Sequence, residues 1–241
     1  LLTFVLFSLI PFEQIVSSYP SFIAAIVTFF RIKDLNTKLE AYERIHEDVP
    51  TSIPAFRTIE ARDLVARHHS RETSGFVLGP INFKLTRGEV SFFVGHNGSG
   101  KTTFMNVIAG LLDVDEGAIF VDGVELKPDD MAAYRARISS VFTHYHVFRE
   151  MHGLEQVTQE QADAAIARVG LTGLTAVENG KVTRLDLSAG QKRRLALAIV
   201  LMENRDILIL DEFVADQDPQ QREYFFRTLL PQFKAAGKTV I

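Results

Sequence analysis

The sequence predicts an α/β domain with a mostly parallel sheet, preceded by an apolar helical segment. Two largely apolar runs, VSFFV at 90–94 and DILIL at 206–210, have the length and composition of strands buried on both faces. A helical pattern follows the first run and precedes the second, and a third run at 237–241 begins another strand. Strands that alternate with helices favour a parallel sheet, because parallel strands are joined by crossover connections.

Composition excludes several classes of protein. Of the 241 residues, 46% are hydrophobic and 23% are charged, which is typical of a chain that folds around a full core. The net charge of −4 gives no electrostatic reason to expect a nucleic-acid partner. Cysteine is absent, which excludes disulfides and thiolate metal sites and suits a reducing compartment.

The first 32 residues are nearly uncharged and predict contact with a membrane. They contain two charges, Glu13 and Arg31, and lack the basic start and small-residue cleavage site of a signal peptide. Leu1–Ile10 is too short to cross a bilayer, which takes about 20 apolar residues. We expect the end of a membrane-spanning helix whose beginning precedes Leu1. A buried helix of a soluble domain is the alternative.

A linker is expected between this segment and the α/β domain. Residues 31–48 are amphipathic, with apolar side chains at helical spacing among charges. Residues 49–56, VPTSIPAF, contain two prolines and small polar residues. We therefore expect the end of a membrane domain at 1–47, a linker at 48–56 and a globular domain at 57–241.

Two further patterns subdivide the globular domain. Residues 81–85, INFKL, alternate strictly between apolar and polar side chains, as a half-exposed strand does. Residues 130–185 are rich in alanine and helical signals and interrupt the alternation of strands and helices. We expect this stretch to form an inserted helical subdomain.

A phosphate-binding loop lies between the first apolar strand and the helix after it. The segment GHNGSGKTT matches the pattern G-x-x-x-x-G-K-[ST] in the strand-to-helix context that the pattern requires. Backbone N–H groups of its glycines can surround phosphates, Lys101 can reach the β- and γ-phosphates, and Thr102 offers its hydroxyl to Mg²⁺. A glycine-rich turn without a ligand is the alternative. The expected phosphate-binding residues are Gly95, His96, Asn97, Gly98, Ser99, Gly100, Lys101, Thr102 and Thr103.

A second segment, LSAGQ, opens a long helix with an unusual charge pattern. Ser188 is a natural N-cap, and Gln191 three residues later completes a capping box. Three cations at 192–194 follow in the first turn, where they oppose the helix dipole. A helix start crowded with positive charge favours binding of an anion. The residues concerned are Leu187, Ser188, Ala189, Gly190 and Gln191.

The phosphate loop, LSAGQ and the later DILILDE together resemble the ATP-binding cassette of ABC transporters over residues 57–241. The resemblance implies a P-loop NTPase with a RecA-like, mostly parallel sheet, an antiparallel β subdomain and an inserted helical subdomain. It also implies a head-to-tail dimer with a second cassette, in which LSAGQ of one chain closes on the γ-phosphate held by the other. We expect ATP and Mg²⁺ as cofactors. We expect a homodimer, with a heterodimer as the alternative, since the presence of both halves of an ATP site does not decide between them.

The same resemblance implies roles for the carboxylates of LILDEFVADQDP. Asp211 would orient Mg²⁺ through water, and Glu212 would be the general base for the water that attacks the γ-phosphate. Lys101 would neutralise charge in the transition state. Asp218 would lie in a loop that contacts the other cassette. Asp216 receives no chemical role.

Two positions depart from the usual cassette. His68, followed by His69, occupies the place of the aromatic residue that stacks on adenine, although a plain surface histidine is the alternative. Thr143 occupies the place of the glutamine that contacts Mg²⁺, which makes it a weak candidate ligand. The three ring-bearing residues at 144–146 favour a surface that meets the membrane domain of the same chain. Two histidines without a third ligand argue only weakly for a metal site.

The residues around the acidic pair narrow the resemblance to one branch. ADQDP, with LSAGQKRRLALA before it and LLPQFKAAGKTVI after it, resembles bacterial exporters of cyclic and nonribosomal peptides, siderophore peptides among them. The implied location is the bacterial inner membrane, with the cassette on the cytoplasmic side. A multidrug or lipid exporter, a soluble non-transport ABC ATPase acting as a clamp, and a cassette without turnover are the alternatives. The histidine that contacts the γ-phosphate in the family lies beyond Ile241, so the isolated chain is expected to bind ATP but hydrolyse it poorly.

Overall fold

The computed structural model describes two units of the chain, Leu1–Val49 and Pro50–Ile241, each treated by itself. The backbone is described for residues 2–44, 56–68 and 76–241, and the side chains for 16–37, 56–67 and 76–241. The helices of the second unit are α2 (Lys101–Ile108), α3 (Met131–Arg135), α4 (Gln159–Arg168), α5 (Ala189–Glu203), α6 (Pro219–Tyr224) and α7 (Leu230–Ala235). A 3₁₀ turn (Pro128–Asp130) precedes α3, and a π-helical segment (Phe225–Leu229) joins α6 to α7.

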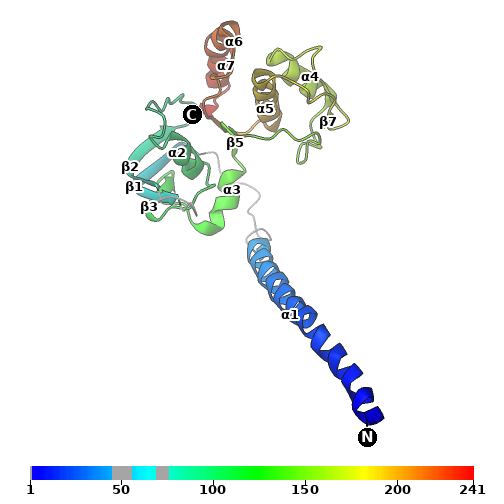
Figure 1. The fold of residues 1–241 in the computed structure, drawn as a ribbon. Helices are drawn as coiled ribbons and strands as arrows, with labels where there is room; N and C mark the ends of the chain where they lie inside the picture. Colours follow the sequence, from blue (N-terminus) through cyan, green and yellow to red (C-terminus); the bar gives the residue numbers. More distant parts are fainter. Residues whose placement is uncertain (1, 45–55, 69–75) are drawn as a thin grey trace. The chain divides into compact units, whose positions relative to one another are not determined.

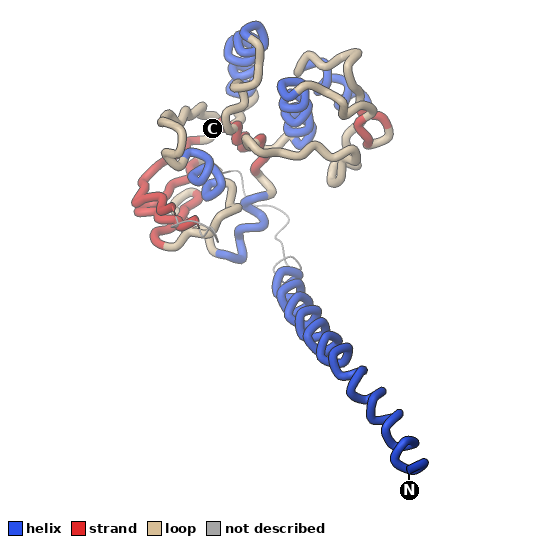
Figure 2. Tube along the Cα trace, in the orientation of Figure 1, coloured by secondary structure: helices blue, strands red, loops and turns tan. Residues whose placement is uncertain are grey.

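The first unit is one helix, α1 (Leu2–Arg44), which is blue in Figure 1 and helical over its length in Figure 2. Its described side chains are solvent-exposed, including Ile32 and Leu35 of the expected apolar stripe. In the described part of the chain, no helix combines the length and apolar character that crossing a membrane requires. The expected linker at 48–56 lies outside the described residues except for Phe56.

Four strands of the second unit form an antiparallel sheet in the order β2-β1-β3-β4 (Figure 1). The predicted alternation of INFKL is confirmed, because its three apolar residues are buried or half-buried and its two polar residues are exposed. One face packs on α2, where the rings of Phe83 and Phe104 meet edge to face at 4.9 Å. The strands are β1 (Thr58–His68), β2 (Phe76–Thr86), β3 (Glu116–Val121) and β4 (Val124–Glu125).

A separate parallel sheet has the order β5-β8-β9 and positions the candidate site. Its central strand β8 confirms the prediction of a buried strand near 206–210. Leu208 of β8 belongs to one hydrophobic cluster, while Ile207 and Ile209 belong to the other. Both faces of the sheet are therefore covered, which explains why the four residues of β8, ILIL, are all apolar. The strands are β5 (Ile138–Val141), β8 (Ile207–Leu210) and β9 (Thr239–Val240).

The prediction of a buried strand at 90–94 is wrong in this structure. Val90 forms one parallel bridge with Val240, and the following residues have no regular secondary structure. Phe92 and Val94 are 66% and 94% exposed rather than buried. The neighbouring strand β9 contains two residues, so pairing along this edge does not continue past the bridge. An apolar run becomes a buried strand only where neighbouring strands cover its backbone.

The predicted helical subdomain at 130–185 is also partly wrong. Strand β5 lies inside this range and belongs to the parallel sheet through four paired residues with β8. After β5 the range contains one α-helix, α4, and a hairpin of β6 (Val177–Glu178) and β7 (Lys181–Val182). Loops make up most of the remainder. The sequence of β5, ISSV, is too short for its strand pattern to be recognised among the helical patterns around it.

Burial of Tyr134 generates a prediction about stability. Its hydroxyl donates to the carbonyl oxygen of Ile108 at 2.7 Å, and burial raises its pKa above the ordinary value. Replacing Tyr134 by Phe is expected to lower the free energy of unfolding at pH 7 by about 1–2 kcal/mol, because a buried carbonyl loses its partner. Urea unfolding measures this, and Tyr224→Phe is the control, since its hydroxyl donates to Arg168 from a half-buried site.

The raised pKa of Tyr134 also predicts how the difference in stability between the wild type and the Tyr134→Phe variant depends on pH. The stability that protonated Tyr134 contributes is complete below the unfolded-state pKa of about 10 and is lost as the pH rises above it. The advantage of the wild type over the Phe variant should therefore shrink above about pH 10. A constant difference across this range would contradict the prediction.

Candidate functional site

The phosphate loop runs from Gly95 into α2 and is largely exposed. Gly98 and Gly100 have φ values of +79° and +91°, a region that glycine enters without strain. A Cβ on Gly100 would also lie 2.7 Å from the ring of Phe76, so the position has room for glycine alone. Helix α2 begins at Lys101 without a side-chain cap, which leaves the N–H groups of its first turn for a ligand.

The ammonium group of Lys101 lies inside the curl of this loop. Its Nζ donates to the carbonyl oxygens of Gly95 and His96, at 2.9 and 3.1 Å. Both acceptors are neutral, whereas hydrogen bonds to an anionic phosphate are stronger. A phosphate in the loop would therefore compete successfully for the ammonium group.

Asp211 is the centre of a polar cluster at the carboxyl ends of β5 and β8. The residue is 1% exposed. Its Oδ2 accepts hydrogen bonds from the hydroxyls of Thr102 and Thr143, each at 2.9 Å. Its Oδ1 is buried and has no hydrogen-bond partner among the described residues. One carboxylate thus joins three segments that are far apart in the sequence.

This group of oxygens suits Mg²⁺. Magnesium prefers oxygen ligands and is usually held by one or two carboxylates, water and substrate phosphates. A buried carboxylate oxygen without a partner is costly, and a cation or its water at Oδ1 of Asp211 would remove that cost. Among the residues whose side chains are described, no group of three or more His, Cys, Asp or Glu could hold a metal ion. Hydroxyls and phosphates would therefore complete the coordination.

Glu212 follows directly in a turn whose backbone is constrained. Its φ of +51° lies in the left-handed region, which costs a non-glycine residue on the order of 1 kcal/mol. Its carbonyl oxygen accepts hydrogen bonds from Nη1 of Arg193 at 2.8 Å and from the backbone N–H of Ala215 at 2.9 Å. The side chain of Glu212 is exposed.

The start of α5 confirms the predicted capping box. The N–H of Gln191 donates to Oγ of Ser188 at 3.3 Å, and the N–H of Ser188 donates to Oε1 of Gln191 at 2.9 Å. Ser188 and Ala189 are exposed. The end of the helix that was predicted to meet a phosphate is therefore open to a partner.

The prediction that the three cations of this helix start serve an anion needs correction for two of them. Arg193 is 4% exposed, and besides its bond to the acidic turn it forms an ion pair of 3.0 Å with Asp216. Arg194 donates to two backbone carbonyl oxygens after α4, at 3.1 and 3.2 Å. Lys192 is exposed. The arginine side chains are long enough to reach neighbouring loops of their own chain, which the local sequence does not reveal.

Two other predicted site residues, Asp218 and His68, lie at the ends of secondary-structure elements. Asp218 is the N-cap of α6, where its Oδ1 accepts from the N–H of Gln221 at 2.9 Å. Its contact with a second cassette stays a prediction. His68 ends β1 and pairs with Phe76. Its side chain and all of His69 lie outside the described part of the chain, so the adenine contact also stays a prediction.

The ring-bearing residues after Thr143 do not share one environment. His144 and His146 are exposed, and His146 packs edge to face on Phe148 at 4.7 Å. Tyr145 is half-buried, and its hydroxyl donates to the carbonyl oxygen of Ala189 at 3.2 Å. The expectation of one surface for all three is thus wrong for Tyr145, which binds the start of α5.

The predicted catalytic residues share one pocket. Lys101, Asp211 and Glu212 line a pocket of about 250 Å³, together with side chains that include Phe92 and Phe213. LSAGQ is not part of this pocket, and within the described residues no hydrogen bond joins LSAGQ to the phosphate loop. The structure therefore gathers one half of the predicted ATP site and keeps the other half apart.

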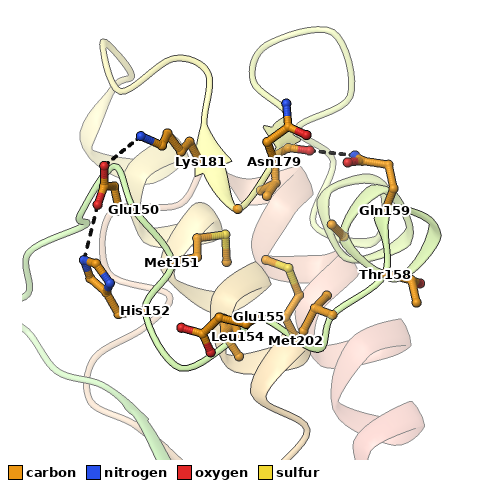
Figure 3. Close-up of a pocket in the computed structure, with 14 residues that line it drawn as sticks. Glu150, Met151, His152, Leu154, Glu155, Thr158, Gln159, Asn179, Lys181 and Met202 are labelled. Carbon is orange, nitrogen blue, oxygen red and sulfur yellow. Dashed lines mark hydrogen bonds and ion pairs between the residues drawn. The ribbon is translucent and has the colours of Figure 1, made fainter.

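A larger pocket of about 470 Å³ lies among α4, the β6–β7 hairpin and the loop before α4 (Figure 3). Figure 3 shows Glu150 between Lys181 and His152, with ion-pair distances of 2.8 and 3.6 Å. Met151 and Met202 contribute apolar lining. None of the predicted site residues lines this pocket, so it is distinct from the phosphate site.

Sequence reasoning missed the partners of Arg193 and the role of Asp216. A signal was present, because Arg193 falls on a helix face whose other buried residues are all apolar. A buried arginine needs an acidic or carbonyl partner. Which partner it takes depends on the fold. Asp216 lies 23 positions later in the chain, across β8.

Comparison with known proteins identifies the family. The sequence profile of the family described as "ABC transporter" matches residues 78–215, more than half of the chain, and these include the phosphate loop, LSAGQ and the acidic pair. The chain belongs to the ABC transporter family. It has the fold of that family's P-loop NTPase cassette and carries its ATPase domain.

Individual relatives match this cassette over part of their own length. The ATP-binding protein SyrD of Pseudomonas syringae pv. syringae is 38% identical, covering 71% of this chain and 31% of SyrD. The ATP-dependent lipid A-core flippase of Escherichia coli (strain K12) is 30% identical, covering 82% of this chain and 35% of the flippase. A structure of a bacterial Atm1-family ABC exporter with ATP bound matches with a TM-score of 0.64 at 22% identity, covering 80% of this chain and 35% of that protein. The chain thus spans about a third of the length of these relatives.

The bond from Thr143 to Asp211 generates a prediction about metal dependence. Replacing Thr143 by Val keeps the shape and removes the hydroxyl, so Asp211 is held by Thr102 alone. In the full-length protein, the Mg²⁺ concentration for half-maximal ATP turnover is expected to rise about three- to tenfold, since groups that hydrogen-bond to metal ligands have effects of this order or larger. Thr143→Ser keeps the hydroxyl and is the control that should resemble the wild type. Equal Mg²⁺ dependence of the Val and Ser variants would contradict a role for this hydroxyl.

Proposed function

We propose that this cassette binds and hydrolyses ATP as the energy-supplying part of an ABC exporter. The observation that carries the proposal is the pocket that Lys101, Asp211 and Glu212 share beside the phosphate loop. Phosphate ligands, a carboxylate suited to Mg²⁺ and a second carboxylate for a proton meet there. Phosphoryl transfer to water needs this combination.

The residues of the chain divide the chemistry among them. N–H groups of the loop and of α2 bind the β- and γ-phosphates, and Lys101 exchanges its carbonyl partners for phosphate oxygens. Thr102 and Asp211 would hold Mg²⁺, with Thr143 orienting Asp211. The ion would neutralise developing charge on the phosphates. The carboxylate of Glu212 accepts a proton from the water that attacks the γ-phosphorus. Water attack breaks the bond to the β–γ bridging oxygen and yields ADP and phosphate.

A second cassette would complete the site. Within one chain the exposed residues Ser188 and Ala189 have no hydrogen bond to the phosphate loop among the described residues. A head-to-tail homodimer would place them at the γ-phosphate of the partner. Asp218, at the start of α6, would then lie near the dimer interface while it caps its own helix.

The transport role rests on the family and on the length of the relatives. SyrD and the lipid A-core flippase are about three times longer than the part that this chain matches. A membrane domain on the same chain, in the bacterial inner membrane with the cassette in the cytoplasm, fits these lengths and the apolar start of the sequence. The resemblance of ADQDP and its flanks supports a cyclic or nonribosomal peptide, including siderophore peptides, as cargo. A lipid exporter is the second candidate, because the flippase is among the relatives.

Two substitutions test the assigned chemistry. Glu212→Gln in the full-length protein is expected to lower the rate of ATP hydrolysis about 100-fold or more and leave nucleotide binding within a few-fold, since loss of a general base costs about 10²–10⁴ in rate. Lys101→Ala is expected to weaken binding of a fluorescent ATP analogue instead. Lys234→Ala, an exposed position on α7, is the control for both. Wild-type hydrolysis by the Gln variant would remove the base assignment.

Fractionation tests the exporter against the soluble clamp. The full-length protein, expressed in its bacterial host, is expected in the inner-membrane pellet after carbonate extraction and to need detergent for release. Recovery in the soluble fraction without detergent would overturn the exporter assignment. The ATPase assignment would be unaffected by that outcome.

A further inference from the structure

The guanidinium group of Arg193 collects acceptors from two segments outside its own helix. Nη1 donates to the carbonyl oxygen of Glu212 at 2.8 Å, and Nη2 forms an ion pair with Oδ2 of Asp216 at 3.0 Å. Nη2 also approaches the carbonyl oxygen of Thr143 at 3.5 Å, and the group lies over the ring of Tyr145 at 5.8 Å. The side chain of Arg193 is 5% exposed, whereas that of Asp216 is 48% exposed.

Such a side chain is costly unless its charge and its donors are used. Nε of Arg193 is buried without a hydrogen-bond partner among the described residues, so the remaining contacts must offset its desolvation. Arginine suits this place because its planar fork reaches two acceptors at once with a fixed angle between them. Lysine carries its three donors on one nitrogen, so it lacks the two separate nitrogens, Nη1 and Nη2, that reach Glu212 and Asp216 here.

Two further contacts fasten the start of α5 to the same turn, and a third fastens it to the loop after β5. Nε2 of Gln217 donates to the carbonyl oxygen of Gly190 at 3.1 Å. A Cβ on Gly190 would lie 2.6 Å from the carbonyl oxygen of Asp216, so the two backbones touch. The hydroxyl of Tyr145 donates to the carbonyl oxygen of Ala189 at 3.2 Å. A shift of α5, which we call the signature helix because LSAGQ opens it, would strain its contacts with residues 212–217.

Glu212 is the residue of this turn most sensitive to such a shift. Its backbone has the left-handed φ of +51°, and such conformations persist only where surrounding contacts enforce them. The bond from Arg193 to its carbonyl oxygen is one of those contacts. Rotation of this peptide would redirect the Glu212 side chain, which is exposed and has no ion pair within the described residues.

We propose that Arg193, oriented by Asp216, is a positioning residue for Glu212 and links the start of the signature helix to the base of the same chain. The inference rests on the proposed function, in which Glu212 is that base. Closure of LSAGQ on the nucleotide of a partner would then reach Glu212 through contacts inside one chain. The two ATP sites of a dimer would be coupled through Arg193 as well as across the interface.

The test uses the full-length transporter reconstituted in proteoliposomes. Arg193→Lys is expected to lower kcat for ATP hydrolysis at least tenfold with KM for ATP changed less than threefold. Asp216→Asn is expected to lower kcat about three- to tenfold, and the double variant should be no slower than Arg193→Lys within twofold. Arg168→Lys is the matched control, because Arg168 also lies over a ring, that of Phe233 at 5.4 Å, but on α4. It should retain wild-type kcat.

Combination with Glu212→Gln separates positioning from a merely structural role. In that background, Arg193→Lys should leave the residual single-turnover rate unchanged within twofold, because there is no base left to position. A further drop equal to that seen with Glu212 present would overturn the inference, as would wild-type kcat in Arg193→Lys. If Glu212→Gln itself hydrolyses ATP at the wild-type rate, the assignment of Glu212 as the base fails first, which is a distinguishable result.

Discussion

Burial of the Asp211 carboxylate constrains the arrangement of everything around the phosphate loop. A carboxylate that is 1% exposed must receive hydrogen bonds, and the donors come from Thr102 at the start of α2 and Thr143 after β5. These bonds hold the phosphate loop and the end of the parallel sheet at one point. The other oxygen, Oδ1, is buried and has no hydrogen-bond partner among the described residues, a deficit that a bound cation or its water would remove. The proposed chemistry depends on this carboxylate being buried, with hydrogen bonds to only one of its two oxygens among the described residues.

Glu212 is adjacent to Asp211 in the sequence but is governed by different contacts. Asp211 is held from the side of the phosphate loop, and the turn at Glu212 is held from the side of α5 through Arg193. The segment 211–213 is therefore held from both sides, at the Asp211 carboxylate by the phosphate loop and at the Glu212 carbonyl oxygen by the start of α5. This division gives a physical reason for pairing one buried and one exposed carboxylate. The first binds a cation, and the second must reach water.

Several elements could be predicted from the sequence because their causes are local. The glycines and lysine of the phosphate loop, the capping box of Ser188 and Gln191, the alternation of INFKL and the apolar run of β8 all follow from residues within a few positions. The strand expected at 90–94 could not be predicted in the same way. Its pairing depends on how many residues of β9 run beside it, and only one bridge forms.

The candidate site shows the same division. Lys101 followed from the phosphate-loop motif, and Asp211 and Glu212 from the resemblance to ABC cassettes; the pocket that the three share is consistent with both. The roles of Arg193 and Asp216 did not follow from the sequence. They depend on a contact between a helix that precedes β8 in the chain and a turn that follows it.

The sequence by itself determined which local structures form and which chemical groups are available. Hydrogen bonds of caps, glycine turns and strand alternation are satisfied by near neighbours, so their signals are contained in short segments. The tertiary structure alone decided which side chains donate hydrogen bonds to the Asp211 carboxylate and which cations bind partners within the chain. It also decided that the start of α5 is exposed. Those outcomes depend on distances between segments remote in sequence. A long side chain such as that of Arg193 takes whichever buried acceptor the fold brings within its reach.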